Sequence, residues 1–245
     1  MQSQTIDAGL EVEFASGDDR IRGVVHAPDR SPSPALVLLP DVRGISPLYL
    51  ELAARFAGAG FRTLVLDIYS REGTPDLADM AAAFSVIDAL PDARVIADVQ
   101  AAVHHLAERP EVHASAVGVV GFCVGGQYAM MAACRVAGLA ACVAFYGMLR
   151  HRTVAQHKLP PPLDTFDDLS CPLLGLFGAE DGLIPREDVE SFARHLAHAG
   201  KTFDVRIFEG AGHAFVNDRR PEAYRPEAAE TALSLAIEFL YERLA

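Results

Sequence analysis

The chain has 245 residues, of which 51% are hydrophobic and 22% are charged. This composition is typical of a folded globular protein and excludes a disordered or collagen-like chain. The net charge of −12 repels phosphate backbones and anionic lipids, so the sequence disfavours nucleic acids and membrane surfaces as partners. We expect one domain, residues 1–245, that is large enough to fold without a metal ion or a disulfide.

The predicted elements alternate between short apolar runs and helix-like segments. In chain order they are a strand at Pro34–Leu39, a helix at Ser46–Ala59, a strand at Arg62–Ile68, a helix at Val95–Glu108, a strand at Val117–Phe122, a helix at Gly125–Arg135, strands at Ala141–Tyr146 and Pro172–Phe177, a helix at Glu187–Ala199, a strand at Phe203–Phe208 and a final helix with Leu233, Ala236, Ile237, Leu240 and Leu244 on one face. This alternation predicts the α/β class, with a mostly parallel sheet and helices on both of its faces. Ligands bind such sheets outside the carboxyl ends of the strands, so functional residues should directly follow the apolar runs.

The segment Leu149–Leu169 interrupts the alternation. It is polar and contains three consecutive prolines at positions 160–162, which predicts a surface excursion. The excursion could flank a binding site or serve only as a solvated connection, and the sequence leaves both interpretations open.

The sequence also predicts where the protein resides. The first residues lack the basic start and apolar core of a signal peptide, and no apolar run approaches the roughly 18 residues of a membrane helix. The four cysteines form no CxxC pair, so neither a zinc site nor a thioredoxin-type motif is indicated. We expect a cytoplasmic protein with free thiols.

One of these cysteines follows the strand Val117–Phe122, in the sequence Gly121-Phe122-Cys123-Val124-Gly125. The pattern corresponds to the nucleophile elbow G-x-S-x-G of a strand-to-helix junction, with sulfur in place of the hydroxyl. The turn is so sharp that side chains two positions before or after the nucleophile would clash, and the helix N-terminus beside the sulfur favours thiolate. A glycine-rich turn around an inert buried cysteine is the alternative.

An acid and a histidine should follow an elbow nucleophile along the chain. Asp181 comes shortly after the strand Pro172–Phe177, and His213 comes shortly after Phe203–Phe208. His213 would take the proton from the thiol and Asp181 would hold the imidazole tautomer. Glu180 is an adjacent rival to Asp181, and both loop positions could instead hold ordinary turn residues.

The first predicted strand leads into Asp41 and Val42. In an elbow enzyme this loop donates one backbone N–H to the oxyanion hole and the residue after the nucleophile donates the other, which assigns Val42 and Val124. Asp41 would lie beside Cys123. It could share the thiol proton and keep the sulfur unreactive until substrate binds, or it could simply cap the turn.

These motifs together resemble one known family. The segments LPDVRGI, LDIYSR, GFCVGGQ, FGAEDGLIP and GAGHAFVNDRRPEAY are similar to those of the dienelactone hydrolases (carboxymethylenebutenolidase-like proteins) of the α/β-hydrolase superfamily. The resemblance runs from about residue 34 to the C-terminus. It implies an α/β-hydrolase fold with Cys123, Asp181 and His213 as the triad, and hydrolysis of an ester or lactone without a metal or organic cofactor.

The chain departs from the family pattern at several positions. Asp41 stands where the family carries glutamate, Ala214 replaces a hydroxyl residue after the histidine, and Asn217 replaces an arginine that holds the substrate carboxylate. The family's other such arginine has no counterpart, because residues 72–93 contain no lysine or arginine. The candidate substrate contacts are Arg71, Phe215 and Asn217. Arg71, Arg219 and Arg220 could bind an anion or form surface salt bridges.

The expected reaction is therefore attack of Cys123 on a small-molecule ester or lactone, with a thioester intermediate. The alternatives are a broad-specificity esterase or phosphotriesterase, a small-molecule binding protein without turnover, and a thiol-redox sensor. The last is disfavoured because no resolving cysteine is adjacent in the sequence. The oligomeric state is not indicated.

Overall fold

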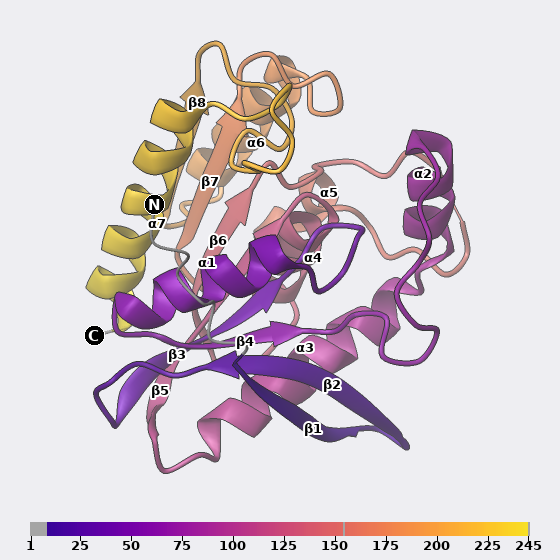
Figure 1. The fold of residues 1–245 in the computed structure, drawn as a ribbon. Coiled ribbons are helices and arrows are strands. Elements are labelled where there is room, and N and C mark those ends of the chain that lie inside the picture. The colour runs from indigo at the N-terminus through magenta and orange to yellow at the C-terminus, as the bar shows by residue number, and fades with distance from the viewer. Residues whose placement is uncertain (1–8, 154, 245) are drawn as a thin grey trace.

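The computed structural model describes residues 9–153 and 155–244, and their strands form one eight-stranded sheet in the order β1-β2-β4-β3-β5-β6-β7-β8 (Figure 1). The strands are β1 (Leu10–Ser16), β2 (Asp19–His26), β3 (Ser33–Leu39), β4 (Arg62–Leu66), β5 (Val112–Phe122), β6 (Leu139–Phe145), β7 (Leu173–Gly178) and β8 (Phe203–Phe208). The pairs β1/β2 and β2/β4 are antiparallel and the remaining pairs are parallel. The predicted α/β class with a mostly parallel sheet is confirmed.

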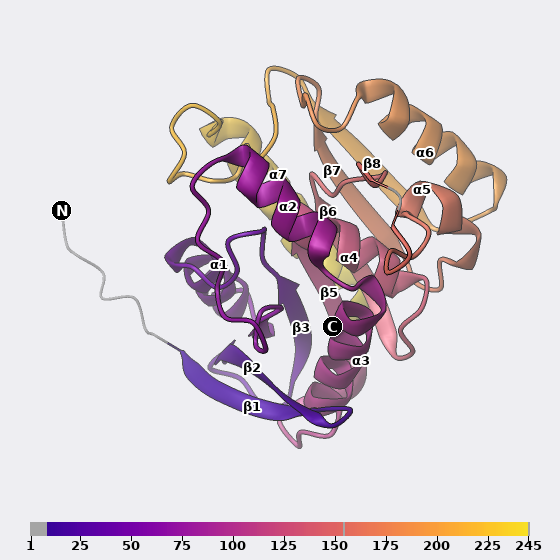
Figure 2. The same cartoon turned by 90° about the vertical axis from the view of Figure 1, so that its right-hand side faces the viewer.

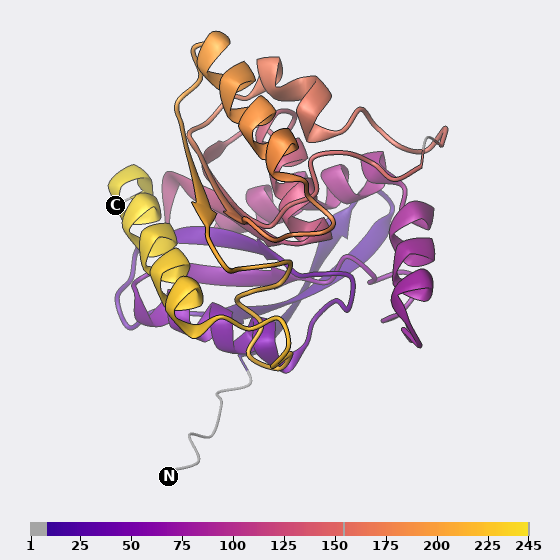
Figure 3. The same cartoon turned by 90° about the horizontal axis from the view of Figure 1, so that it is seen from above.

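Helices cover both faces of this sheet, as predicted. They are α1 (Pro47–Gly58), α2 (Met80–Ala89), α3 (Asp92–Ala107), α4 (Val124–Ala133), α5 (Pro162–Thr165), α6 (Arg186–His198) and α7 (Pro226–Leu244), with a 3₁₀ turn at Phe166–Asp168. Helices α1 and α7 lie on one face, and α3, α4 and α6 lie on the other (Figure 3). Every residue of Ala35–Leu39 in β3 is completely buried, because a central strand covered on both faces has no solvent-exposed side.

The sequence did not predict the β1–β2 hairpin or helix α2. Strand β1 is an edge strand whose residues are mostly exposed. Helix α2 is apolar around most of its circumference, so it has no periodic stripe, and only Ala83 and Ile87 are buried. The Asp79 side chain caps its N-terminus by accepting a hydrogen bond from Ala82 N–H. Figure 2 shows α2 crossing in front of the sheet, with its C-terminal end leading into α3.

The remaining segments differ less from expectation. The predicted excursion Leu149–Leu169 leaves the sheet after β6 and includes the short helix α5 and the 3₁₀ turn. None of the described helices combines the length and the apolarity that are needed to cross a bilayer.

Candidate active site

The candidate nucleophile occupies a strained turn between β5 and α4. Cys123 has φ 57° and ψ −120°, in a region that non-glycine residues rarely adopt. Its N–H donates to Phe145 O at 3.1 Å, which holds the turn against the neighbouring strand. The side chain is half-buried. Strain at a half-buried cysteine is typical of a functional position rather than of a packing residue.

The glycines around Cys123 allow this turn. A Cβ atom on Gly121 would lie 2.1 Å from the carbonyl oxygen of Gly125, and one on Gly125 would lie 2.3 Å from that of Leu39. Both are backbone atoms, which cannot move aside without moving a strand or the helix. The predicted need for glycine on both sides of the cysteine is confirmed.

An aspartate and a histidine follow the two strands β7 and β8, and the structure brings them together. Asp181 is buried, and its Oδ2 accepts a hydrogen bond from His213 Nδ1 at 2.8 Å. Its Oδ1 accepts the N–H groups of Leu183 and Ile184, which fixes the carboxylate against its own loop. Glu180 is exposed, so Asp181 is the residue that orients the imidazole.

Cys123 and His213 line the same cavity, and the Cys123 sulfur acts on the imidazole electrostatically. Nε2 is buried and has no partner at hydrogen-bond geometry among the described residues. Burial alone would lower the pKa of His213, but the Cys123 sulfur and the hydrogen-bonded Asp181 outweigh burial and raise this pKa from 6.5 to about 10. A histidine with this pKa is positively charged at neutral pH and carries a proton on each ring nitrogen.

Backbone strain recurs around the histidine. Tyr146 has φ 37° and Ala214 has φ 62°, and the Tyr146 ring meets the edge of the His213 ring at a centroid distance of 5.2 Å. Burial raises the pKa of Tyr146 well above its ordinary value, so its hydroxyl stays neutral. Three of the described non-glycine residues have positive φ, and all three lie at this site.

A cavity of about 300 Å³ opens over Cys123 and His213. Its wall on one side is apolar and comes from α2 and the residues before it. Its other side carries charge from the loop after β3 and the loop before α7. The lining residues are Asp41, Val42, Arg43, Leu77, Ala78, Asp79, Met80, Ala83, Phe84, Ile87, Cys123, Met148, Leu183, His213, Ala214, Arg220 and Glu222.

The two residues predicted for the oxyanion hole, Val42 and Val124, lie on either side of the candidate nucleophile's turn: one in the loop after β3 and one at the start of α4. Val42 lines the cavity, and within the described part of the chain its N–H donates to no backbone or side-chain oxygen. Val124 is the first residue of α4, where a helix leaves its N–H groups without intrahelical partners. Their role as oxyanion donors stays a prediction.

Asp41 lies in the cavity wall, but its carboxylate is engaged by its own loop. Oδ1 accepts the N–H of Arg43 at 2.8 Å, and Oδ2 lies 3.7 Å from the Arg43 guanidinium. The Tyr69 hydroxyl donates to Val42 O at 3.0 Å, which fixes the same loop. The gating role of Asp41 toward the thiol stays a prediction.

The three predicted substrate contacts are not at the cavity. The Arg71 guanidinium pairs with Asp98 at 2.7 Å and also with Asp19. Phe215 is completely buried against Tyr146 and Phe208. Asn217 is buried, and its Oδ1 accepts the N–H of Arg219.

Two other arginines line the cavity instead. Arg43 follows the predicted oxyanion residue Val42, and Arg220 follows the histidine loop. The Arg220 Nε donates to Glu222 at 3.0 Å, and within the described residues the other guanidinium N–H groups donate to no protein oxygen, so they can bind a ligand. Arg220 is one of the residues that the sequence offers as an anion binder, whereas Arg43 is not among them, although it directly follows Val42. No group of three or more His, Cys, Asp or Glu side chains arranged to hold a metal ion occurs in ranges 9–153 and 155–244.

Several known proteins are similar to this chain. The model of the dienelactone hydrolase family matches residues 21–244. A protein of Bradyrhizobium sp., named "Probable 2-oxo-3-(5-oxofuran-2-ylidene)propanoate lactonase", is 33% identical over 98% of this chain and 96% of its own length. A "Putative carboxymethylenebutenolidase" of Salmonella typhimurium is 31% identical over 92% of this chain and 84% of its own.

A solved structure shows the same architecture. The crystal structure of a "Putative Dienelactone Hydrolase" from Klebsiella pneumoniae subsp. pneumoniae superimposes with a TM-score of 0.88 at 27% identity, over 95% of this chain and 98% of that one. The α/β-hydrolase fold expected from the sequence is confirmed.

Proposed function

This chain belongs to the dienelactone hydrolase family, and from that premise we propose that it hydrolyses lactones or carboxylic esters with Cys123, His213 and Asp181 as its catalytic triad. The observation that carries the proposal is the Asp181–His213 hydrogen bond of 2.8 Å, made by a histidine that lines the same cavity as Cys123. Relatives named as lactonases and butenolidases support hydrolysis at an ester bond.

The first half of the reaction forms a thioester. The Cys123 sulfur attacks the carbonyl carbon, and the carbonyl oxygen becomes an oxyanion held by the N–H groups of Val42 and Val124. The intermediate collapses as the bond between carbon and the leaving oxygen breaks. The proton on His213 Nε2 passes to that oxygen, which leaves as an alcohol or as the opened end of the lactone.

The second half releases the acid. A water molecule gives a proton to His213 Nε2 and attacks the thioester carbon. The carbon–sulfur bond then breaks, the product leaves as a carboxylic acid, and the sulfur and the protonated imidazole return to their starting states. Asp181 keeps Nδ1 protonated throughout, so that Nε2 is the atom that exchanges protons.

Trapping the thioester tests this mechanism. Mixing the enzyme with p-nitrophenyl acetate and quenching in acid within the first turnovers should give a protein heavier by one acetyl group. Peptide mapping should place that group on Cys123, because its sulfur is the attacking atom. Acetylation of another residue, with Cys123 unmodified, would remove the proposed nucleophile.

The charge at the cavity mouth supports a finer proposal, that the substrate carries a carboxylate. The Bradyrhizobium relative is named for a propanoate that contains a lactone ring. Arg43 and Arg220 line the charged side of the cavity and are 48% and 33% exposed at their side chains. A guanidinium with unused donors binds carboxylates well. These two arginines, rather than Arg71 and Asn217, are then the anion-binding residues.

Replacing Arg220 by glutamine should weaken turnover of an anionic ester selectively. A charged hydrogen bond is worth about 1.5–3 kcal/mol, so kcat/KM for mono-(p-nitrophenyl) succinate should fall about 10- to 100-fold. The value for p-nitrophenyl butyrate, which has the same chain length without the charge, should change little. Arg219→Gln is the matched control, because Arg219 pairs with Glu51 and does not line the cavity. Equal losses on both esters would contradict carboxylate recognition.

A further inference from the structure

Helix α2 supplies the apolar wall of the cavity but packs weakly against the rest of the fold. Met80, Ala83, Phe84 and Ile87 line the cavity, yet only Ala83 and Ile87 of this helix are buried. A helix with so little buried surface needs other contacts to hold a fixed position, because its own packing contributes little. The position of this wall is therefore set elsewhere in the chain.

The described residues 150–153 and 155–160, which we call the strap, provide these contacts. The Arg152 guanidinium lies 3.4 Å above the centre of the Phe84 ring, on a residue of the cavity wall. The His157 ring nitrogen Nε2 contacts Asp88 O at 2.6 Å. The strap thus contacts α2 at Phe84 and near its C-terminal end. None of the described strap residues lines the cavity itself, so the excursion reaches the site through α2.

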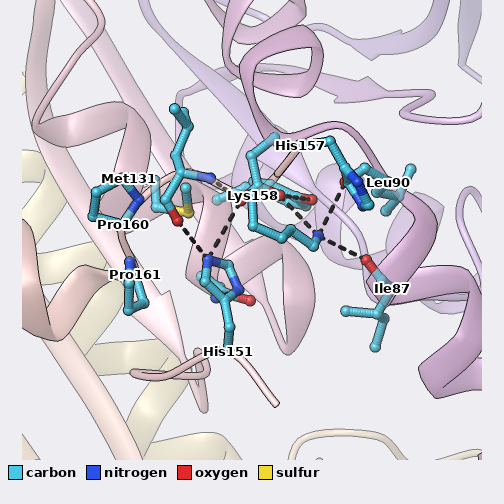
Figure 4. Close-up of polar contacts among 12 residues, drawn as sticks. Ile87, Leu90, Met131, His151, His157, Lys158, Pro160 and Pro161 are labelled. Carbon is cyan, nitrogen blue, oxygen red and sulfur yellow. Dashed lines mark hydrogen bonds and ion pairs between the residues drawn. The ribbon is translucent and has the colours of Figure 1, made fainter. Parts of the chain in front are cut away.

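Lys158 is the central contact of the strap. Its side chain is only 4% exposed, and its ammonium group donates to Ile87 O at 2.8 Å, Leu90 O at 3.0 Å and Asp92 Oδ1 at 2.9 Å (Figure 4). An ammonium group has three N–H donors, so all are used. The two carbonyls belong to the C-terminal end of α2, where a cation is favourable, and Asp92 begins α3, where an anion is favourable.

Asp92 connects this contact to the helix behind the nucleophile. The carboxylate is completely buried and also accepts the Tyr128 hydroxyl at 2.8 Å and the Leu159 N–H at 2.9 Å. Tyr128 lies on α4, which begins directly after Cys123. One residue earlier, Gln127 contacts His151 of the strap at 3.1 Å. The polar cluster in Figure 4 therefore joins α2, α3 and α4 around one lysine.

We propose that Lys158 is a positioning residue that fixes α2 relative to the nucleophile's helix and thereby sets the preference of the cavity for apolar groups of the substrate. This inference rests on the proposed hydrolytic function. Cys123, His213 and Asp181 lie on β5, β8 and β7 or on the loops after them, and Lys158 contacts none of these residues. Loss of the lysine should therefore displace the wall and leave the triad in place.

Steady-state kinetics of Lys158→Met on two neutral esters test the inference. Two extra methylene groups that contact an apolar wall are worth about tenfold in kcat/KM. The ratio of kcat/KM for p-nitrophenyl butyrate to that for the acetate should therefore fall about tenfold in the variant, mainly through KM for butyrate. The kcat for acetate should stay within about threefold of wild type. Hydrogen exchange at residues 80–89 should become faster.

Lys201→Met is the matched control, because Lys158 and Lys201 are the two lysines of the chain and Lys201 also donates to two backbone carbonyls, those of Asp167 and Leu169. These carbonyls lie far along the chain from α2, so the control should keep the wild-type ratio. If Lys158→Met does not fold, His157→Ala removes an exposed contact of the strap with α2, and the same ratio should fall by a smaller factor.

The outcomes separate this inference from the proposed function. A wild-type protein that hydrolyses neither ester contradicts the proposed function. An active wild type whose ester ratio is preserved in a folded Lys158→Met variant contradicts only the positioning role. Equal losses of kcat on both esters would also contradict it, because they indicate a general structural effect rather than control of the apolar wall.

Discussion

Alanine in place of Cys123 should lower kcat for p-nitrophenyl acetate by about 10⁴- to 10⁶-fold, the loss seen when a triad nucleophile is removed. The attacking sulfur is then absent, and neither His213 nor the amides of Val42 and Val124 can form a covalent intermediate. Cys134→Ala is the matched control, because Cys134 is a half-buried thiol at the other end of the same helix. It should retain wild-type turnover.

The Cys123→Ala variant can also be tested by a measurement that does not depend on turnover, the pKa of His213. The Cys123 sulfur is the largest of the contributions that raise the pKa of His213. Without it, burial of the ring opposes the charged form, and only Asp181 still favours it. The pKa of His213 measured by NMR titration should therefore fall from about 10 in Cys123→Ala. An unchanged pKa together with lost turnover would mean that sulfur and imidazole do not interact as proposed.

The second large effect is expected at Gly125. An alanine Cβ there would lie 2.3 Å from Leu39 O and 2.4 Å from Pro40 O, so the end of β3 or the start of α4 must move. Such overpacking costs about 3 kcal/mol in free energy of unfolding. The displaced loop carries Val42, and loss of one oxyanion donor lowers kcat by about 10²- to 10³-fold.

Gly182→Ala is the control for this substitution. A Cβ on Gly182, next to Asp181, would meet no atom within 4 Å, so the free energy of unfolding in urea should change by no more than about 0.5 kcal/mol. A Gly125→Ala variant with the stability and turnover of wild type would show that the elbow tolerates a side chain. The prediction that only glycine fits at position 125 would then be wrong.

The parts of the candidate site that depend on local sequence could be predicted from the sequence. The glycines around Cys123 follow from the sharpness of one turn, and Asp181 and His213 follow apolar runs that become β7 and β8. Parallel strands bring such positions to one edge of the sheet, so chain order is enough to place them together. For the same reason the sequence predicts Val42 and Val124 as oxyanion donors, a role that stays a prediction.

The parts of the site that the sequence did not predict depend on contacts between residues far apart in the chain. Lys158 contacts Ile87 and Asp92, which lie 71 and 66 positions away, and its polar surroundings are typical of an exposed loop. The sequence offered Arg71 as a substrate contact, but its guanidinium is bound by Asp98, 27 positions away. Helix α2 has no amphipathic stripe, because one side faces a cavity rather than a packed core. Partners of this kind leave no periodic signal in the sequence.

The weak packing of α2 bears on how this enzyme could be redesigned. Its side chains line the cavity, while the residues of the proposed triad lie on the loops after strands β5, β7 and β8. A library of substitutions confined to positions 80, 83, 84 and 87 should therefore change the substrate range while leaving Cys123 and His213 unchanged. The helix can be treated as an exchangeable part, provided that the residues which hold its C-terminal end are kept.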